Sequence, residues 1–283
     1  MNTEIYYFSG TGNSLLIAKE AQKRIPESEI LPIACLLKKD KITSKGKTIG
    51  IVFPVHALTI PIAVKKFLRR IDLSEAEYIF AIANRHGTVF HGFKKIDRLL
   101  RKKWKRLNAQ FIIDMYNNDS RHGIYHVPSR EEIAAYEQGA LEKMDAAAEI
   151  ILGRGSHFED IKNHKFKSAS NPVAAFLIER LVLALMNIAE HTRGVNYFYY
   201  DDKCTGCGIC EKVCLAGKIS MVDGNPVWWK NTLCYMCFAC LNFCPVKAVQ
   251  IHDIPGVKSH SKENGRYPHP YASIGDMLRQ KGE

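Results

Sequence analysis

Eight of the nine cysteines of this 283-residue chain lie between residues 204 and 244, in two sets of identical spacing. Each set reads C-x2-C-x2-C-x3-C, and the second follows the first at an offset of 30 residues: Cys204, Cys207, Cys210 and Cys214, then Cys234, Cys237, Cys240 and Cys244. Three closely spaced thiolates suit three irons of a cubane, and the fourth iron needs a thiolate from elsewhere. The repeat supplies that thiolate, so the spacing predicts two [4Fe-4S] clusters.

Zinc and disulfides are the alternative uses of these thiols. Zinc sites more often use two C-x2-C pairs separated by a longer loop, which this spacing does not match. The N-terminal residues 1–6 lack both the basic and the apolar stretch of a signal peptide, so we expect a cytoplasmic protein. Thiols in a reducing compartment bind metals more often than they form disulfides. A zinc-binding interaction module stays open as the alternative of another class.

The segment from about Asp201 to Asp253 resembles the bacterial two-[4Fe-4S] ferredoxins. That resemblance implies crossed ligation, in which Cys244 completes the first set of three cysteines and Cys214 completes the second. Pro245 follows Cys244 as in those ferredoxins, whereas Leu215 follows Cys214. We expect this departure to change local rigidity rather than to remove a cluster, because the ligand itself is present.

A second candidate site lies near the N-terminus, where an apolar run over residues 5–8 is followed by Ser9-Gly10-Thr11-Gly12-Asn13-Ser14. A helix is expected to begin near Leu15. Free N–H groups at a helix start, two glycines and three hydroxyls form a phosphate cradle. The loop lacks the third glycine of the dinucleotide fingerprint and the Gly-Lys-Ser/Thr of a P-loop. A glycine turn without a ligand is the alternative reading.

The first 152 residues alternate short apolar runs with amphipathic stretches. The apolar runs at Ile5–Phe8, Thr48–Phe53, Tyr78–Ala83 and Phe111–Met115 predict strands buried on both faces. Helical crossovers between such strands favour an α/β doubly wound parallel sheet of about five strands. A closing helix is predicted over Ser129–Leu152, with Ser129 and Glu132 as a capping box.

This first half resembles the flavodoxins in its loop and in its alternation of strands and helices. The resemblance implies that Ser9, Thr11, Gly12, Asn13 and Ser14, in a loop that also contains Gly10, hold the phosphate of FMN. Ligands of such folds lie at the carboxyl ends of the strands. Two further loops there are expected to flank the isoalloxazine: Pro54, Val55 and His56 after the third strand, and Asn84, Arg85, His86 and Gly87 after the fourth. Flavodoxins usually place stacking aromatic residues in these loops, and this chain offers His56 and His86.

The rest of the chain divides into a connector over residues 153–194, the ferredoxin-like domain over 195–253 and a tail over 254–283. A helix is predicted over Val173–Glu190. Glu179 and Arg180 interrupt its apolar stretch, so we expect no transmembrane segment. A soluble two-domain chain needs a brace, so we expect this helix to pack on both halves, with a membrane-surface role as the alternative.

Forty Lys and Arg against 29 Asp and Glu give a formal charge of +11, which favours an acidic partner. The ferredoxin-like segment contains five of each sign, so the excess lies elsewhere. Residues 94–106 hold eight Lys or Arg and one acidic residue. We expect this stretch either to dock an acidic redox protein or to be a solvated face. Trp104 is its only aromatic residue, so we expect no nucleic acid partner.

Taken together, the chain resembles a family of fused flavodoxin–ferredoxin proteins labelled EFR1-type ferredoxins. Pro226-Val227-Trp228 and Gly265-Arg266-Tyr267-Pro268-His269-Pro270 also resemble that family. The resemblance implies two [4Fe-4S] clusters and FMN, and no assigned substrate. We therefore expect an electron-transfer protein that passes electrons between clusters and flavin. An FMN-dependent reductase of a small oxidised substrate is the alternative, and no catalytic residue can be assigned.

Overall fold

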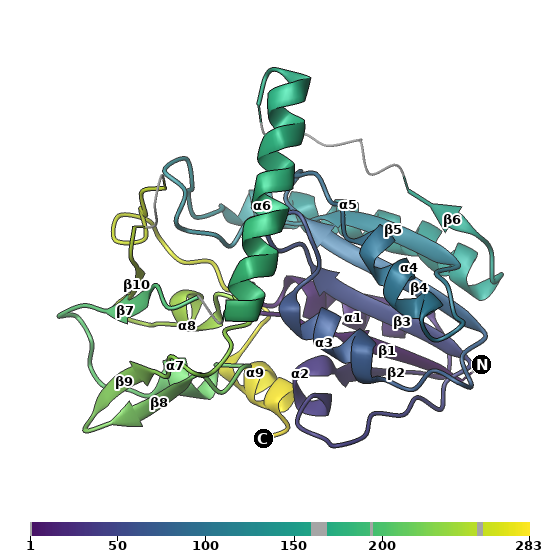
Figure 1. The fold of residues 1–283 in the computed structure, drawn as a ribbon, viewed down its shortest axis with the longest axis horizontal. Coiled ribbons are helices and arrows are strands. Elements are labelled where there is room, and N and C mark those ends of the chain that lie inside the picture. The colour runs from purple at the N-terminus through teal and green to yellow at the C-terminus, as the bar shows by residue number, and fades with distance from the viewer. Residues whose placement is uncertain (1, 160–168, 193–194, 254–256) are drawn as a thin grey trace.

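The computed structural model describes residues 2–159, 169–192, 195–253 and 257–283. Its largest element is a parallel sheet with the order β2-β1-β3-β4-β5-β6 (Figure 1). The strands are β1 (Thr3–Tyr7), β2 (Ser28–Pro32), β3 (Thr48–Pro54), β4 (Tyr78–Arg85), β5 (Ala109–Asp114) and β6 (His157–Phe158). The order β2-β1-β3-β4-β5 is the flavodoxin-like one, with its switch point between β1 and β3.

Both faces of this sheet are covered by helices, as the buried strands predict. Every residue of β1 and β4 is buried. Helices α1 (Asn13–Arg24) and α5 (Arg130–Leu152) pack on one face. The other face carries α2 (Ile33–Leu36), α3 (Ile62–Arg70) and α4 (Phe93–Arg101). The predicted doubly wound α/β fold is therefore confirmed.

Two features of α5 and β6 refine the boundary of this half. Ser129 caps α5 by accepting a hydrogen bond from the N–H of Glu132, whose side chain returns to the N–H of Ser129, so the predicted capping box is confirmed. Beyond α5, His157 and Phe158 pair with β5. The sheet thus continues past residue 152, where the sequence pattern placed its end.

The connector helix α6 (Pro172–Thr192) projects from the body of the molecule (Figure 1). Its large apolar side chains are exposed along most of its length, including Leu177 and Leu181. The expectation that this helix packs on both halves is therefore wrong. Its polar contacts with the body come from two carboxylates: Glu179 faces His91, and Glu190 faces Lys65 and Arg69.

The C-terminal part is built from two short antiparallel pairs. β7 (Phe198–Tyr200) pairs with β10 (Val249–Ile251), and β8 (Ile219–Val222) pairs with β9 (Asn225–Trp228). The short helices α7 (Ile209–Lys212) and α8 (Ala239–Asn242) each contain the third cysteine of one set, Cys210 and Cys240. The repeat extends to the backbone, because positive φ angles at Gly206, Gly208 and Gly217 recur 30 residues later at Met236, Phe238 and Lys247.

The two halves share one apolar core. Val213, Leu215, Tyr235 and Ala239 of the cysteine-rich part belong to the same buried cluster as the residues of α3 and α4. The C-terminal helix α9 (Ile274–Lys281) completes this cluster with Met277, which is fully buried. A small cysteine-rich fold has little core of its own, so this shared packing supplies part of its stability.

The halves meet most closely at Gly10. A Cβ atom on Gly10 would lie 2.0 Å from the carbonyl oxygen of Cys237, closer than any real contact allows. Glycine is therefore required here by the approach of another backbone rather than by its own φ angle. The contact sets the distance between the loop after β1 and the second cysteine set.

We predict that Gly10→Ala lowers the free energy of unfolding by about 1–3 kcal/mol, because the added methyl group overpacks a backbone that cannot yield. The matched control is Gly139→Ala in α5, where an added Cβ has no neighbour within 4 Å. That control should gain about 0.5–1 kcal/mol from helix propensity. Thermal unfolding of both variants under oxygen-free conditions measures the difference, and an unchanged midpoint for Gly10→Ala would contradict the close contact.

Candidate functional site

The eight clustered cysteines surround two cavities, each with about 320 Å³ of empty space. The first is lined by Cys204, Cys207, Cys210 and Cys244, and the second by Cys214, Cys234, Cys237 and Cys240. Each cavity thus combines three cysteines of one set with the fourth of the other. This is the crossed grouping that the ferredoxin resemblance implied.

The surroundings of the thiols fit a cluster better than a free thiolate. Burial raises the pKa of Cys210 and of Cys234 to about 11, and raises the pKa of Cys237 as well. A sulfur atom so removed from water is stable as a thiolate only beside a compensating cation such as iron. Among the described residues, no three His, Cys, Asp or Glu side chains lie close enough together to hold a single metal ion. The cysteines instead stand around the walls of the two larger cavities.

Main-chain N–H groups point at two of the sulfur atoms in the same way in both repeats. The N–H of Lys218 donates to Cys214 Sγ at 3.2 Å, and the N–H of Ala248 donates to Cys244 Sγ at 3.2 Å. Hydrogen bonds of this kind stabilise electron density on a cysteine sulfur and so influence the potential of a cluster that it binds. Leu215, the residue that replaces the expected proline, leaves this geometry intact.

Lys218 also places its ammonium group beside the second cavity, which it lines. The residue is 1% exposed, and Nζ donates to Asn196 Oδ1, Trp229 O and Thr232 O, each at 2.8 Å. Three acceptors satisfy the three donors of the ammonium group. The side chain is therefore fixed, and its charge is held out of water close to the second set of thiols.

A third pocket lies at the carboxyl edge of the sheet and contains about 430 Å³ of empty space. Of the loop residues predicted to bind FMN, all but Gly12 and Gly87 line it: Ser9, Gly10, Thr11, Asn13, Ser14, Pro54, Val55, His56, Asn84, Arg85 and His86. Gly12 is the N-cap of α1 with φ 111°, and the Gly87 N–H donates to Asp114 Oδ1. Three loops separated in sequence thus share one pocket.

The loop after β1 keeps donors available for an anion. In the part of the chain that the structure describes, the main-chain N–H groups of Gly10, Thr11, Asn13 and Ser14 have no hydrogen-bond partner. These groups lie at the positive end of α1. The donor set therefore fits a phosphate group.

The side chains of the loop are fixed by neighbours from other loops. Ser14 Oγ donates to Asn84, and Thr11 Oγ1 accepts from Asn118 Nδ2 at 2.7 Å. Asn13 Nδ2 donates to the Tyr116 carbonyl at 2.9 Å, while its buried Oδ1 has no partner among the described residues. The loop after β1 is thus tied to the end of β4 and to the loop after β5.

Sequence reasoning missed three residues of this pocket, Tyr116, Asn117 and Asn118. They follow β5 at the same edge of the sheet, so the rule that located the other two loops could have located this one. Tyr116 adds the aromatic ring that the earlier loops lack, and its centroid lies 5.2 Å from that of His86. The two rings are inclined at 55° to each other.

His56 contributes a neutral imidazole to the pocket. Burial lowers the pKa of His56 to about 4, and the nearby Asp119 opposes this only in part. The ring is therefore uncharged at neutral pH. Its Nδ1 is buried and has no hydrogen-bond partner in the described structure, so it can form one hydrogen bond with a bound ring system.

The loop after β5 holds the two halves together beside this pocket. Asn118 O accepts from Asn242 Nδ2 at 3.1 Å, and the guanidinium of Arg121 lies 5.2 Å from the ring centroid of Phe238. Burial opposes the charge of Asp119, but hydrogen bonds from Arg121 and His122 outweigh it and hold the pKa of Asp119 below its ordinary value. This ion pair within the loop holds Arg121, whose contact with Phe238, together with the hydrogen bond from Asn242, joins the loop to the cysteine-rich part.

The C-terminal tail closes over the loop after β1. The His269 N–H donates to the Thr11 carbonyl at 2.7 Å. Gln280 clamps Ser9 with two hydrogen bonds, from its Nε2 to the Ser9 carbonyl and from the Ser9 N–H to its Oε1. Besides the stretch Gly265–Pro270, which contains His269, the sequence contains a second signal for this segment, the S-x-x-D capping box formed by Ser273 and Asp276 at the start of α9.

Cys237 lines both the third pocket and the second four-cysteine cavity. It is one of the eight cysteines predicted to bind iron, and it faces a pocket predicted to bind flavin. No motif in either half indicates that these two sites share a wall. The arrangement places the second set of thiols directly beside the pocket, and the first set farther along the same domain.

Residues 203–249 match the family model described as a 4Fe-4S dicluster domain. The cysteine-rich part of the chain therefore carries a ferredoxin-type iron–sulfur domain. The match covers only this part of the chain. No curated protein matches the sequence.

Solved structures similar to the first half include flavin-related proteins. An archaeal flavodoxin is 10% identical with a TM-score of 0.30, and the match covers 53% of this chain and 99% of that one. An FMN-dependent NADH-azoreductase from Bacillus anthracis, solved with FMN, is 11% identical with a TM-score of 0.34, over 53% of this chain and 98% of that one. Rubredoxin oxygen:oxidoreductase from Desulfovibrio gigas is 13% identical with a TM-score of 0.32, over 54% and 37%. The flavodoxin-like class of the first half rests on its own strand order.

Proposed function

We propose that this chain is an electron-transfer protein that holds two [4Fe-4S] clusters and one FMN, of the fused flavodoxin–ferredoxin kind. The observation that carries the proposal is the position of Cys237, which lines both the pocket at the sheet edge and the second four-cysteine cavity. When bound, the clusters supply one-electron steps and the flavin supplies one- or two-electron steps.

The residues of the chain have separate roles in this proposal. Cys214, Cys234, Cys237 and Cys240 hold the cluster next to the flavin, and Cys204, Cys207, Cys210 and Cys244 hold the farther one. The N–H groups of the loop after β1 bind the phosphate. His56 and Tyr116 contact the ring system, the first as a neutral hydrogen-bonding group and the second through its aromatic face. The contact between Gly10 and Cys237 keeps the two cofactors at a fixed separation.

Cofactor content is the first test of this function. Protein isolated without oxygen should contain about eight iron and eight acid-labile sulfide per chain, as two cubanes require, together with one FMN. A protein that is folded but contains zinc in place of iron would overturn the proposal in favour of a zinc module.

We predict that Thr11→Val weakens FMN binding about tenfold and leaves the iron content unchanged. The hydroxyl group lies in the phosphate loop, and a hydrogen bond to a charged group is worth roughly 1.5–3 kcal/mol. The matched control is Thr3→Val in β1, where the buried hydroxyl has no partner in the described structure. Flavin titration of the two variants measures the effect, and equal affinities would rule out a phosphate at this loop.

We predict that Cys237→Ala and Cys207→Ala each lose one cluster, with different consequences for the flavin. Cys237→Ala removes the cluster next to the flavin, so it should slow reduction of the flavin by a reduced ferredoxin-type donor about a hundredfold or more. A hundredfold change corresponds to about 2.8 kcal/mol added to the barrier, because each 1.4 kcal/mol slows a step tenfold. Cys207→Ala should leave the nearer cluster beside the flavin.

Electron paramagnetic resonance identifies which cluster remains in each variant, and stopped-flow absorbance follows the flavin. The Cys207→Ala protein is the matched control for the loss of four irons. If the two variants reduce the flavin at equal rates, the cluster bound by Cys237 does not lie on the electron path.

We predict that Lys218→Met lowers the reduction potential of the cluster held by Cys214, Cys234, Cys237 and Cys240. A buried cation favours the more negative, reduced cluster, and its loss should shift the potential by roughly 60 mV, the one-electron equivalent of 1.4 kcal/mol. Lys212→Met in α7 is the control, because its exposed charge is screened by water. Redox titration monitored by electron paramagnetic resonance measures both, and equal potentials would assign Lys218 a purely structural role.

A further inference from the structure

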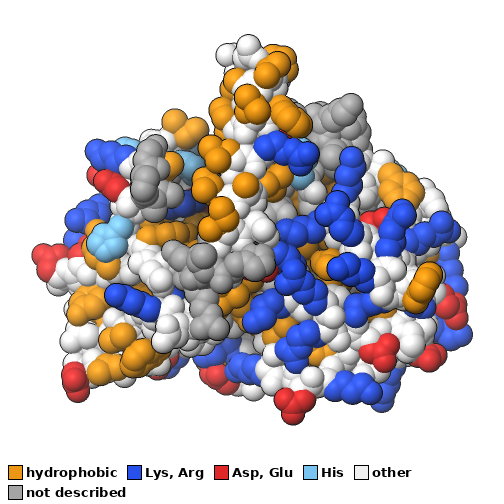
Figure 2. Space-filling model, in the orientation of Figure 1, with side chains coloured by type: hydrophobic (Ala, Val, Ile, Leu, Met, Phe, Trp, Pro, Cys, Tyr) orange, Lys and Arg blue, Asp and Glu red, His pale blue; other side chains and the backbone are white. Residues whose placement is uncertain are grey.

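Helix α6 turns its apolar side towards solvent. Its exposed large apolar residues are between 42% and 65% accessible, namely Val173, Phe176, Leu177, Ile178, Leu181, Leu185 and Ile188. They extend over about 23 Å of helix at 1.5 Å per residue. Figure 2 shows hydrophobic side chains along much of the helix, whose tip stands clear of the rest of the molecule. Patches of this kind in a folded protein mark an interaction site.

The opposite side of α6 contacts the body through two carboxylates. Glu179 Oε2 lies 2.8 Å from His91 Nε2, and Glu190 pairs with Lys65 and, at 3.6 Å, with Arg69. Glu179 and Glu190 are 11 residues apart, which is three helical turns, so they lie on one side. The side of α6 that faces the protein therefore carries these two carboxylates together with partly buried apolar residues, and most of the large apolar side chains of the helix are presented outward.

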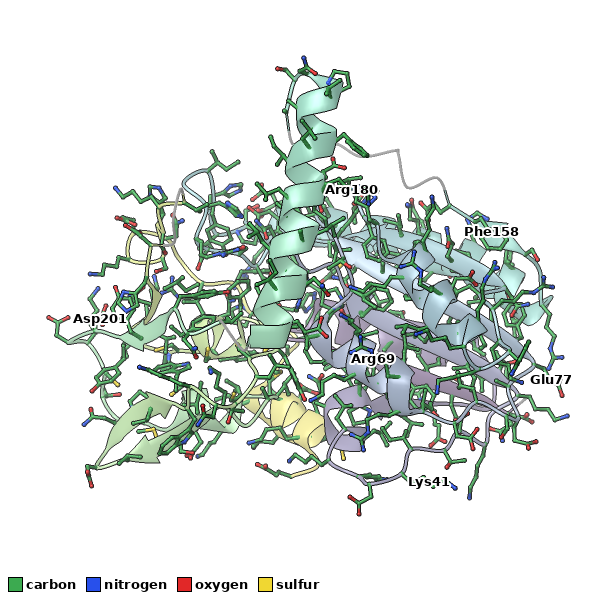
Figure 3. All side chains as sticks on the ribbon, viewed as in Figure 1. Lys41, Arg69, Glu77, Phe158, Arg180 and Asp201 are labelled. Atoms are coloured by element: carbon green, nitrogen blue, oxygen red, sulfur yellow. The ribbon has the colours of Figure 1, made fainter. Side chains whose placement is uncertain are left out.

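Positive charge surrounds the base of this helix. Figure 2 shows Lys and Arg side chains gathered on the same face of the molecule, over α3 and α4, and Figure 3 places Arg69 beside the lower half of α6 and Arg180 on the helix itself. The exposed cations of α3, α4 and the segment after α4 are Arg69, Arg70, Lys94, Arg98, Arg101, Lys102 and Arg106. Asp97 is paired with Arg101, so the face is strongly cationic. Trp104, within this segment, is 96% exposed.

We propose that this face binds the surface of a membrane that contains anionic lipids, with the apolar side of α6 inserted at the level of the headgroups. Exposed hydrocarbon together with surrounding Lys and Arg is the combination that interfacial helices use. Cations near an anionic bilayer each contribute about 1 kcal/mol. No helix within the described residues has the length and apolar character needed to cross a bilayer, so α6 would lie on the membrane surface.

Charge and chemistry favour this occupant over two others. A second copy of the chain would bring one cationic face against another, which like charges oppose. A specific protein partner forms about one hydrogen bond per 100–200 Å² of interface, and the outer side of α6 offers mainly hydrocarbon. Lipid tails need no hydrogen bonds from the helix, and anionic headgroups match the surrounding cations.

Sedimentation with lipid vesicles tests the proposal on the full-length protein loaded with its cofactors. We expect it to bind vesicles of phosphatidylcholine that contain phosphatidylglycerol, and to bind much less to vesicles of phosphatidylcholine alone or at high salt. Leu177→Glu/Leu181→Glu should weaken binding about tenfold or more, since it removes apolar area and adds negative charge. Both side chains are exposed, so circular dichroism and cluster absorbance should not change.

The matched control for that double variant is Ile124→Glu/Val222→Glu, two exposed apolar residues outside α6. A second pair separates charge from apolar contact. Lys94→Glu/Arg98→Glu on α4 should weaken binding to anionic vesicles, whereas Lys41→Glu/Lys45→Glu, which makes the same charge change on exposed lysines, should have little effect. Figure 3 shows Lys41 at the edge of the molecule remote from α6.

Three outcomes would overturn the proposal. These are the absence of vesicle binding, equal binding to neutral and anionic vesicles, and equal binding by the α6 variant and its control. Self-association through α6, detected by analytical ultracentrifugation as a dimer that Leu177→Glu/Leu181→Glu abolishes, together with no vesicle binding, would assign the face to a second copy of the chain. None of these results depends on the cofactor path proposed above.

Discussion

The approach of the Cys237 main chain to Gly10 is the constraint on which the arrangement of the two halves depends. It brings the second set of thiols to the carboxyl edge of the sheet, where the other residues that line the pocket come from the strand ends and the loops that follow them. Around it lie the ring of Tyr235, whose centroid is 6.1 Å from that of Phe8, and the clamp of Gln280 on Ser9. A small cysteine-rich fold could stay tethered by a linker, but here it contributes to the apolar core of its neighbour. The two halves are therefore one packed unit around the pocket.

The parts of the site that were predicted from sequence are those whose spacing is fixed locally. A thiol at x2 or x3 from its neighbour can reach only certain positions, so the spacing predicted two sets of cysteines, and the ferredoxin resemblance implied the crossed grouping in which they line the two cavities. The loops after β1, β3 and β4 were predicted by a rule of comparable strength, because the carboxyl ends of parallel strands meet at one edge. Tyr116 was missed although the same rule covers it, since the loop after β5 contains no glycine motif or histidine to draw attention.

Contacts between segments far apart in sequence were not predictable in the same way. Cys237 lines both the pocket and the second cavity only because the surface of the cysteine-rich part fits the carboxyl edge of the sheet. No hydrophobic period or motif in either half indicates how these two surfaces fit. The tail shows a similar limit. Ser273 and Asp276 indicate that a helix begins, but the docking of Met277 into the core and of His269 on Thr11 depends on the shape of the other segments. The apolar residues of α6 indicated a helix correctly, and the inference that the protein itself covers them was wrong.

The orientation of α6 follows from Lys65, a residue that sequence reasoning did not single out. Lys65 lies in α3 at 4% exposure, and a buried ammonium group without a partner is strongly unfavourable. Glu190 provides that partner, and Glu179 makes the equivalent contact with His91 three turns away. Rotating α6 about its axis would carry both carboxylates away from these two side chains and leave the Lys65 ammonium group buried without a partner, which costs about 3–5 kcal/mol. The pairing with Lys65 therefore favours the orientation in which Glu179 and Glu190 face the first half and the exposed leucines face outward.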